Sequence, residues 1–410
     1  MSFQWYRTLD QDGRRAFWTS FAGFGLDSME IQLYGFVLPV LLALWGVSHT
    51  AAGALATVAL VSSAAGGWLA GVLADRIGRV RMLQTTILWF AIATCLCGLA
   101  RDFDQLLLAR ALQGLGFGGE LAVGAVFVAE IARPQVRGRM VGMVQSGWAV
   151  GWGLAAISAT VLLAVLPPDL GWRVTFLVGL VPALLVFAYR KRLRESPAFL
   201  SMSGRSSWRG IFSAAQRSTT MKGCLLATGM HGGYWAIATW WPTMLRAERG
   251  LSLMASSAYL GALIVGSFFG YVVGAWLGDR VGRRATLMGC ATGGIVLALC
   301  CGQLPLADTM LILLSVPLGC FATGMYSVIG ALLAEVYPTE SRGSGLGFCY
   351  NFGRAAAGAA PLLVGGSVAA MGIGQAIGLY VAGAYGVVLL AAVLLPETRG
   401  WSLKGLSDAS

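Results

Sequence analysis

Long apolar stretches recur along almost the whole chain and constrain its fold more than any other feature. A helix that crosses the hydrocarbon core of a bilayer needs about 20 mainly apolar residues. The stretches cover residues 17–43, 51–74, 82–100, 105–131, 140–166, 172–189, 223–245, 254–278, 285–303, 306–335, 343–370 and 374–395. These runs are too long and continuous for barrel strands, which alternate every second residue. We therefore expect an all-α membrane protein with about 12 transmembrane helices.

Composition and charge support the same class. Only 11% of the 410 residues are charged and 57% are hydrophobic, whereas soluble domains are about 25% charged. The net charge is +11, and most Lys and Arg residues fall in the termini and in alternate loops. Because short cytoplasmic loops are enriched in these residues, we expect a multi-pass protein of the cell inner (plasma) membrane with both termini cytoplasmic. The excess of Lys and Arg thus indicates the membrane topology, and nucleic-acid binding is not expected.

The sequence lacks the motifs that are typical of several other functional classes. The first 16 residues are polar and precede a run of full membrane length, so we expect no cleavable signal peptide. All eight cysteines lie in or beside apolar stretches, and their spacing to the two histidines predicts no metal site or disulfide. No phosphate-binding loop or nucleophile motif is present. We therefore expect neither an enzyme nor a cofactor, and an ion gradient rather than ATP as the energy source.

Three signatures occur twice in the same order. Gly71–Arg81 matches Gly274–Arg284, Glu130–Arg139 matches Glu335–Gly343, and Glu195–Pro197 weakly matches Pro396–Gly400. Parallel repeats of this kind relate two halves by an axis along the membrane normal, with a substrate site between them near mid-membrane. We therefore expect an N-terminal six-helix bundle (1–189), a cytoplasmic linker (190–222) and a C-terminal six-helix bundle (223–410).

These signatures resemble those of the major facilitator superfamily. The run Gly71-x-x-x-Asp-Arg-x-Gly-Arg79 is similar to the loop after its second helix, and Arg110–Gly116 is similar to its fourth-helix motif. Pro396–Gly400 and Glu195–Pro197 resemble the sugar-porter branch and its organic-ion relatives. The resemblance implies a transporter that works by alternating access.

Two further motifs resemble organic-acid symporters. Asp27-x-x-Glu30 is similar to the Asp-x-x-Asp of aromatic-acid:proton symporters, and Gly118-Gly-Glu120 resembles metabolite:proton and sialate/lactate-type symporters. Ser28 and Met29 depart from the Gly-aromatic pair usual between the two acids. This departure weakens the expectation of an aromatic substrate more than the expectation of symport.

Away from the span ends, five charged residues fall inside predicted spans, where a charge costs about 2.5–3.5 kcal/mol or more. They are Asp27, Glu30, Arg110, Glu120 and Arg354. Asp27 and Glu30 share one helix face, and two close carboxylates in a low dielectric cannot easily both ionise. This suits reversible protonation, although one acid could instead pair with an Arg of a neighbouring helix. The resemblance implies that Arg110 and a helix-one carboxylate act in proton coupling; we favour Arg110–Asp27, with Glu120 as a competitor.

Arg354 is the main candidate for substrate binding. It follows Tyr350 and Asn351 in the predicted eleventh helix, with no acid nearby in the sequence. A guanidinium binds a carboxylate in two places, and the resemblance to organic-anion transporters implies anion recognition. Alternatively, Arg354 pairs with a carboxylate of another helix or extends to an interface.

Polar and aromatic residues of two other helices complete the predicted substrate site. His231, Tyr234 and Trp235 lie in the seventh helix, where His231 is the repeat counterpart of Asp27. Gln145 and Trp148 lie on one face of the fifth helix. Ordinary helix packing is the competing interpretation for all five.

Charged residues at the helix ends are expected to gate access, because the resemblance implies it. They are Asp75, Arg76, Arg79, Asp279, Arg280, Arg283, Glu130, Arg137, Glu335 and Arg342. The alternative is that they only set topology.

Together these features predict proton-coupled symport of a small organic anion, a mono- or aromatic carboxylate, by a functional monomer in the lipid bilayer. A sugar or polyol porter is the main alternative, followed by a metabolite or drug exporter. A nutrient sensor that binds without transport is a further possibility, and a channel is disfavoured by the two-half architecture.

Overall fold

The computed structural model describes residues 4–7, 9, 11–131, 140, 143–191, 193, 195, 208–337 and 342–399. Within these residues the regular structure is entirely helical. The first half contains α1 (Gln4–Arg7), α2 (Gln11–Trp45), α3 (His49–Ile77), α4 (Arg79–Leu99), α5 (Phe103–Ile131), α7 (Gly147–Val165), α8 (Pro168–Leu177) and α9 (Leu180–Arg190). The second half contains η1 (Trp208–Phe212), α11 (Arg217–Ala247), α12 (Leu253–Arg280), α13 (Arg283–Gln303), α14 (Asp308–Gly324), α15 (Tyr326–Val336), α16 (Arg342–Ala357), α17 (Ala359–Met371) and α18 (Ile373–Leu394).

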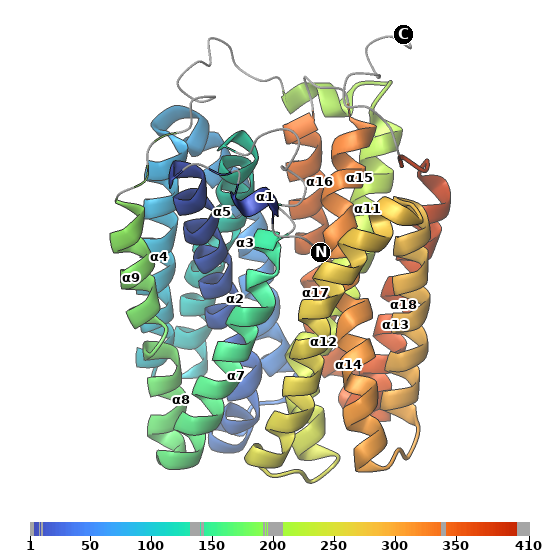
Figure 1. Cartoon of the computed structure of the whole chain (residues 1–410). Helices are drawn as coiled ribbons and strands as arrows, with labels where there is room; N and C mark the ends of the chain where they lie inside the picture. Colours follow the sequence, from blue (N-terminus) through green and yellow to red (C-terminus); the bar gives the residue numbers. More distant parts are fainter. Residues whose placement is uncertain are drawn as a thin grey trace.

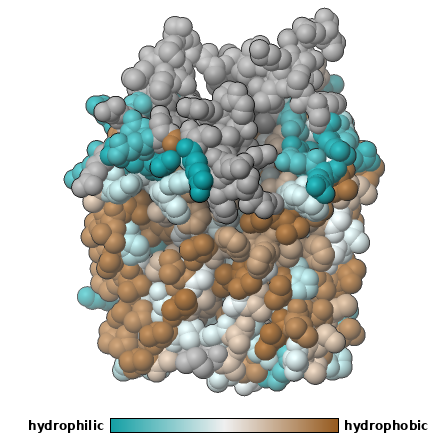
Figure 2. Space-filling model, viewed as in Figure 1, coloured by the Kyte–Doolittle hydropathy of each residue, from teal (hydrophilic) through white to brown (hydrophobic). Residues whose placement is uncertain are grey.

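The helices form two bundles that stand side by side (Figure 1). Ten helical stretches of the described residues are long and apolar enough to cross a membrane. Two more predicted spans, 105–131 and 223–245, are the long helices α5 and α11, which pack inside the bundles. On the face seen in Figure 2, apolar residues form a broad belt and hydrophilic residues gather towards one end. The predicted all-α membrane fold is therefore confirmed.

The two bundles repeat one packing scheme. In the first half α3 packs on α5 and α2 packs on α7; in the second half α12 packs on α14 and α11 packs on α16. Helix starts repeat as well. Ser48 accepts a hydrogen bond from the backbone of Ala51 at the start of α3 (3.1 Å), and Ser252 accepts one from Ala255 at the start of α12 (3.2 Å). The two halves therefore repeat both the packing order and the cap at the start of their second long helix.

The glycine that ends each signature loop is required by backbone conformation. Gly78 before α4 and Gly282 before α13 have φ values of 104° and 115°, which L side chains rarely adopt. Each allows an immediate turn from one spanning helix into the next.

The halves meet at the end of the bundles that carries residues 46–48, 248–252 and 372, here called the short-loop end. The opposite end, called the linker end, carries α1 and the segment after α9. Near the short-loop end, α3 packs on α17 and α7 packs on α12. A Cβ atom at Gly53 of α3 would lie 2.5 Å from the backbone oxygen of Pro361 in α17, and the hydroxyls of Thr160 in α7 and Ser257 in α12 are 2.8 Å apart. The molecule is therefore closed at the short-loop end.

Close helix contacts depend on glycine, and Gly118 of α5 is the sharpest case. A Cβ atom there would lie 1.6 Å from the backbone oxygen of Ser63 in α3. No side-chain rotation relieves a clash with backbone, so substitution must separate the two helices.

We expect Gly118→Ala to lower the midpoint of thermal unfolding in detergent, because overpacking of this kind costs about 1–3 kcal/mol or more. Gly261→Ala in α12 is the matched control, since a Cβ there meets no atom within 4 Å. It should leave the midpoint unchanged or raise it, because Ala is the better helix former. Equal midpoints for the two variants would contradict the predicted contact.

Candidate transport site

A cavity lies between the two halves and takes side chains from both. Its empty space is about 410 Å³, including the space at its mouth. It is lined by Phe24, Phe117, Gln145, Trp148, His231, Tyr234, Trp235, Tyr271, Tyr326, Tyr350 and Arg354. All predicted substrate-binding residues except Asn351 line it. The side-chain amide of Asn351 instead donates to the Gly347 carbonyl of its own helix (3.0 Å), and its oxygen lies against Gly67 of α3.

Arg354 is the one residue with a permanent charge among the lining side chains, and it is 1% exposed. Its guanidinium carbon lies 4.9 Å from the ring centre of Phe117 and 5.3 Å from that of Tyr350. Within the described part of the chain, neither Nη1 nor Nη2 has a hydrogen-bond partner. The aromatic rings thus hold a cation whose donors remain available.

His231 provides a second polar group in the same cavity. Its Nδ1 lies 2.9 Å from the Tyr326 hydroxyl, and its ring stands edge-on to Tyr350 at 4.6 Å. The Nε2 atom is buried and has no hydrogen-bond partner in the described part of the chain.

Aromatic side chains form most of the remaining wall. The hydroxyl of Tyr234 accepts hydrogen bonds from the indole of Trp148 (2.5 Å) and the amide of Gln32 (3.1 Å). These bonds join α11 to α7 and α2, so the wall ties the two halves together. Trp235 also borders a smaller cavity that Arg110 lines, so its indole separates the two spaces.

Sequence reasoning missed four aromatic lining residues: Phe24, Phe117, Tyr271 and Tyr326. Tyr326 directly follows the position that matches Glu120 in the repeat. Comparison of the halves could therefore have found it.

The buried charges of the first half are linked by a chain of hydrogen bonds. Thr94 of α4 lies 2.5 Å from Oε2 of Glu30, and Gln113 of α5 donates to the Thr94 hydroxyl (2.8 Å). The carbonyl oxygen of Gln113 accepts from Nη1 of Arg110 (2.5 Å). Arg110 also donates to the backbone oxygen of Leu55 (3.3 Å).

This chain corrects the favoured pairing of Arg110 with Asp27. The acid that the Arg110 chain reaches is Glu30, and two uncharged side chains separate them. The guanidinium of Arg110 also lies 4.6 Å from the ring centre of Tyr34. Asp27 is buried on α2 and lies close enough to Arg354 for electrostatic attraction. The side chain of Glu120 lies outside the described part of the chain.

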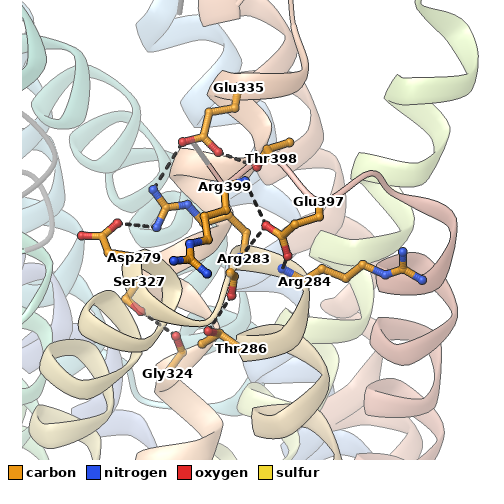
Figure 3. Close-up of polar contacts among 11 residues, drawn as sticks. Asp279, Arg283, Arg284, Thr286, Gly324, Ser327, Glu335, Glu397, Thr398 and Arg399 are labelled. Atoms are coloured by element: carbon orange, nitrogen blue, oxygen red, sulfur yellow. Dashed lines mark hydrogen bonds and ion pairs between the residues drawn. The ribbon is translucent and has the colours of Figure 1, made fainter. Parts of the chain in front are cut away.

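A charge cluster lies at the linker end of the second half (Figure 3). Arg283 forms ion pairs with Asp279 (2.5 Å) and Glu335 (3.3 Å), and Thr398 donates to Glu335 (2.5 Å). The cluster therefore joins α12, α13, α15 and the segment after α18. Arg280 differs from the expectation, because its guanidinium lies over the ring of Trp276 (4.8 Å) instead.

The first-half counterpart is described only in part. Arg79 is buried at the start of α4. The side chains of Asp75, Arg76, Glu130 and Arg342, and all of Arg137, lie outside the described residues.

Glutamates of the third signature bind the first turns of α4 and α13. Glu397 accepts hydrogen bonds from the backbone N–H groups of Arg283 (2.9 Å) and Arg284 (3.1 Å). Glu195 accepts equivalent bonds from Arg79 (3.0 Å) and Val80 (3.2 Å). A carboxylate is favourable at a helix N-terminus, which explains why each half keeps a glutamate there.

Burial works to raise the pKa of Glu397, but backbone N–H donors outweigh it. The donors belong to Arg283, Arg399, Arg284 and Thr398, and they hold the pKa below its usual 4.5.

Comparison with known proteins gives a consistent result. A family model described as Major Facilitator Superfamily matches residues 20–301 and 224–407. A probable 4-methylmuconolactone transporter of Cupriavidus pinatubonensis is 38% identical, over 99% of this chain and 96% of its own length. A cis,cis-muconate transport protein of Acinetobacter baylyi is 30% identical, over 85% of this chain and 86% of its own. The proton:xylose symporter XylE bound to 6-bromo-6-deoxy-D-glucose has a TM-score of 0.77 at 19% identity and covers 97% of this chain and 98% of its own.

We expect Glu397→Gln to lower the midpoint of thermal unfolding at pH 7. The loss in the free energy of unfolding should not exceed that of a lost helix cap, about 1 kcal/mol. Because the folded-state pKa is depressed, the wild-type carboxylate stabilises the fold above pH 4.5, and this contribution is lost as pH falls through the lower folded pKa. The gap between the two midpoints should therefore close in acid. A gap that stays constant from pH 7 to acid would show that the carboxylate charge is not involved.

Proposed function

Because the chain belongs to the major facilitator superfamily, and is thus a membrane transporter rather than an enzyme, we propose that it is a proton-coupled symporter of a small organic anion. It would act as a monomer by alternating access. The observation that carries this proposal is the buried Arg354 guanidinium, whose terminal nitrogens have no partner within the described residues and which lines a cavity between the halves.

The cavity chemistry suits a compact carboxylate with an apolar body. A buried cation without a carboxylate partner is costly, and an anionic ligand would offset this cost through a two-point contact. The surrounding rings of Phe117, Trp148, Trp235 and Tyr350 favour a flat, unsaturated ligand body. Relatives named as transporters of 4-methylmuconolactone and of cis,cis-muconate support this substrate class.

A sugar or polyol is less well served by these residues. Sugar sites usually rely on Gln and Asn side chains, and Gln145 is the one carboxamide among the residues that line the described cavity. The likeness to the xylose symporter is at 19% identity and concerns the fold.

Proton coupling is supported by the bonding of Glu30. Arg110 can only donate, so the Gln113 carbonyl must face it and the Gln113 amide must donate to Thr94. The single Thr94 proton then has two acceptors within reach: Glu30 at 2.5 Å and the Phe90 carbonyl at 2.9 Å. When Glu30 is ionised, the Thr94 hydroxyl donates to its carboxylate. When Glu30 is protonated, the carboxyl group donates to the Thr94 oxygen and the Thr94 hydroxyl donates to the Phe90 carbonyl. The site thus accepts both charge states without moving a heavy atom.

Substrate and proton are linked through Asp27. Electrostatic attraction between Asp27 and Arg354 weakens when the acid is neutralised. Protonation in the first half would therefore leave the Arg354 cation available for the anion.

Alternating access requires the closed short-loop end to open while the linker end closes. Excess Lys and Arg at the linker end favours a cytoplasmic position for it, so the described conformation is closed towards the outside. The ion pairs of Arg283 with Asp279 and Glu335 lie within the second half, so as part of a cytoplasmic gate they would hold the ends of α12, α13 and α15 together and rearrange when this end closes.

We expect proteoliposomes with an inward proton gradient to accumulate labelled benzoate, and Arg354→Gln to raise the KM at least about tenfold, because a bidentate charged contact contributes about 1.5–3 kcal/mol. Arg101→Gln is the control, since Arg101 is exposed in the loop before α5. Xylose uptake that survives Arg354→Gln, with no benzoate uptake, would overturn the proposal in favour of a sugar porter.

We expect Thr94→Val to reduce proton-driven accumulation about tenfold or more while benzoate counterflow continues, because exchange needs no net proton transfer. The matched control is Thr175→Val, whose buried hydroxyl bonds only to the Gly171 carbonyl of its own helix (2.7 Å) among the described contacts. Equal accumulation by the two variants would exclude the Thr94 hydroxyl from coupling.

A further inference from the structure

Two side chains with unsatisfied polar atoms line the same cavity, and the proposed function uses only one of them. Arg354 offers Nη1 and Nη2, and His231 offers Nε2; all three atoms are buried and lack hydrogen-bond partners within the described residues. His231 itself is 2% exposed. A buried polar atom without a partner destabilises the protein, so its presence in a ligand cavity indicates a group to be bound there.

We propose that His231 determines specificity by hydrogen-bonding a second heteroatom of the substrate, so that the protein selects carboxylates that also carry a ring nitrogen, hydroxyl or carbonyl. This inference rests on the proposed function, because it assumes that Arg354 holds the carboxylate. It adds a requirement for a second polar group, which Arg354 alone would not impose.

The position of Tyr350 limits how far apart the two polar groups of the substrate lie. Its ring centre is 4.6 Å from the His231 ring centre and 5.3 Å from the guanidinium carbon of Arg354. The distance between the His231 ring centre and the guanidinium carbon of Arg354 therefore cannot exceed the sum of these two distances. A ligand that bridges them must be compact, with its heteroatom on the same small ring or short chain as the carboxylate.

Tyr326 allows His231 to bind either a donor or an acceptor. A tyrosine hydroxyl both donates and accepts, and neutral imidazole has two tautomers. If the Tyr326 hydroxyl donates to Nδ1, then Nε2 carries the proton and binds an acceptor such as a ring nitrogen. If the hydroxyl accepts from Nδ1, then Nε2 is free to accept from a ligand hydroxyl. The 2.9 Å contact fits both arrangements.

Packing alone accounts for only part of the His231 environment. Edge-on contacts with Tyr326 and Tyr350 would be made equally well by phenylalanine. These contacts do not give the Nε2 atom a hydrogen bond. A packing role and a ligand-binding role of His231 can therefore be separated by experiment.

The test compares two probes of nearly identical shape, benzoate and nicotinate, which differ by one ring nitrogen. We would measure Kd by calorimetry with purified full-length protein: wild type, His231→Phe, His231→Gln, Arg354→Gln and His49→Phe. His49 is the other histidine of the chain and lies at the start of α3, away from the cavity-lining residues.

Wild type should bind nicotinate more tightly than benzoate, and His231→Phe should shift the ratio of the two Kd values about tenfold towards benzoate, as expected when a ligand polar atom loses its partner. His231→Gln should restore part of the preference, and His49→Phe should not change it. Arg354→Gln should weaken both probes together.

Two results would overturn the inference. One is equal Kd values of nicotinate and benzoate for wild type, a result that does not depend on the folding of any variant. The other is an unchanged ratio in a folded His231→Phe protein. If the proposed function is wrong, the pattern is different: neither probe binds wild type, or Arg354→Gln changes neither Kd. The inference about His231 then fails as well.

Discussion

The hydrocarbon core of a bilayer offers no hydrogen-bond partners, and the architecture of this protein follows from that constraint. Backbone groups satisfy one another within helices, and close contacts at residues such as Gly118 let the helices exclude lipid from between them. Buried hydroxyls bond to carbonyls of their own helix, as Thr175 does with Gly171. Several other buried polar atoms of the described region also lack partners, but among these residues only Arg354 and His231 line the cavity, which makes them the candidate sites for a ligand.

The same constraint explains what the sequence predicted well. Apolar runs predicted the helices, because only helices or closed barrels span a bilayer. Charges inside these runs are so costly that Arg354 and Glu30 could be singled out without any structure. The repeated signatures predicted two related halves, and the caps at Ser48 and Ser252 occupy matching positions in them.

Neutral residues were harder to predict, because nothing in a sequence separates a polar linker from a packing residue. Thr94 and Gln113 carry the link between Glu30 and Arg110, yet threonine and glutamine occur in many spans for other reasons. Without them, the family resemblance favoured a direct Arg110–Asp27 pair. Asn351 was expected to bind substrate, but its amide donates to Gly347 of its own helix and it is not among the residues that line the described cavity. Side-chain direction at this level depends on helix rotation, which sequence spacing alone does not fix.

Trp148 and Trp235 line the cavity while most of the 14 tryptophans of the chain lie elsewhere. Indole emission responds to the polarity around the ring and is quenched by contact with electron-poor aromatic molecules. A ligand in the cavity that contacts these two rings would change a small, separable part of the intrinsic fluorescence. The cavity therefore contains its own optical probe, and replacing the remaining tryptophans one group at a time would let occupancy be followed in real time without a label.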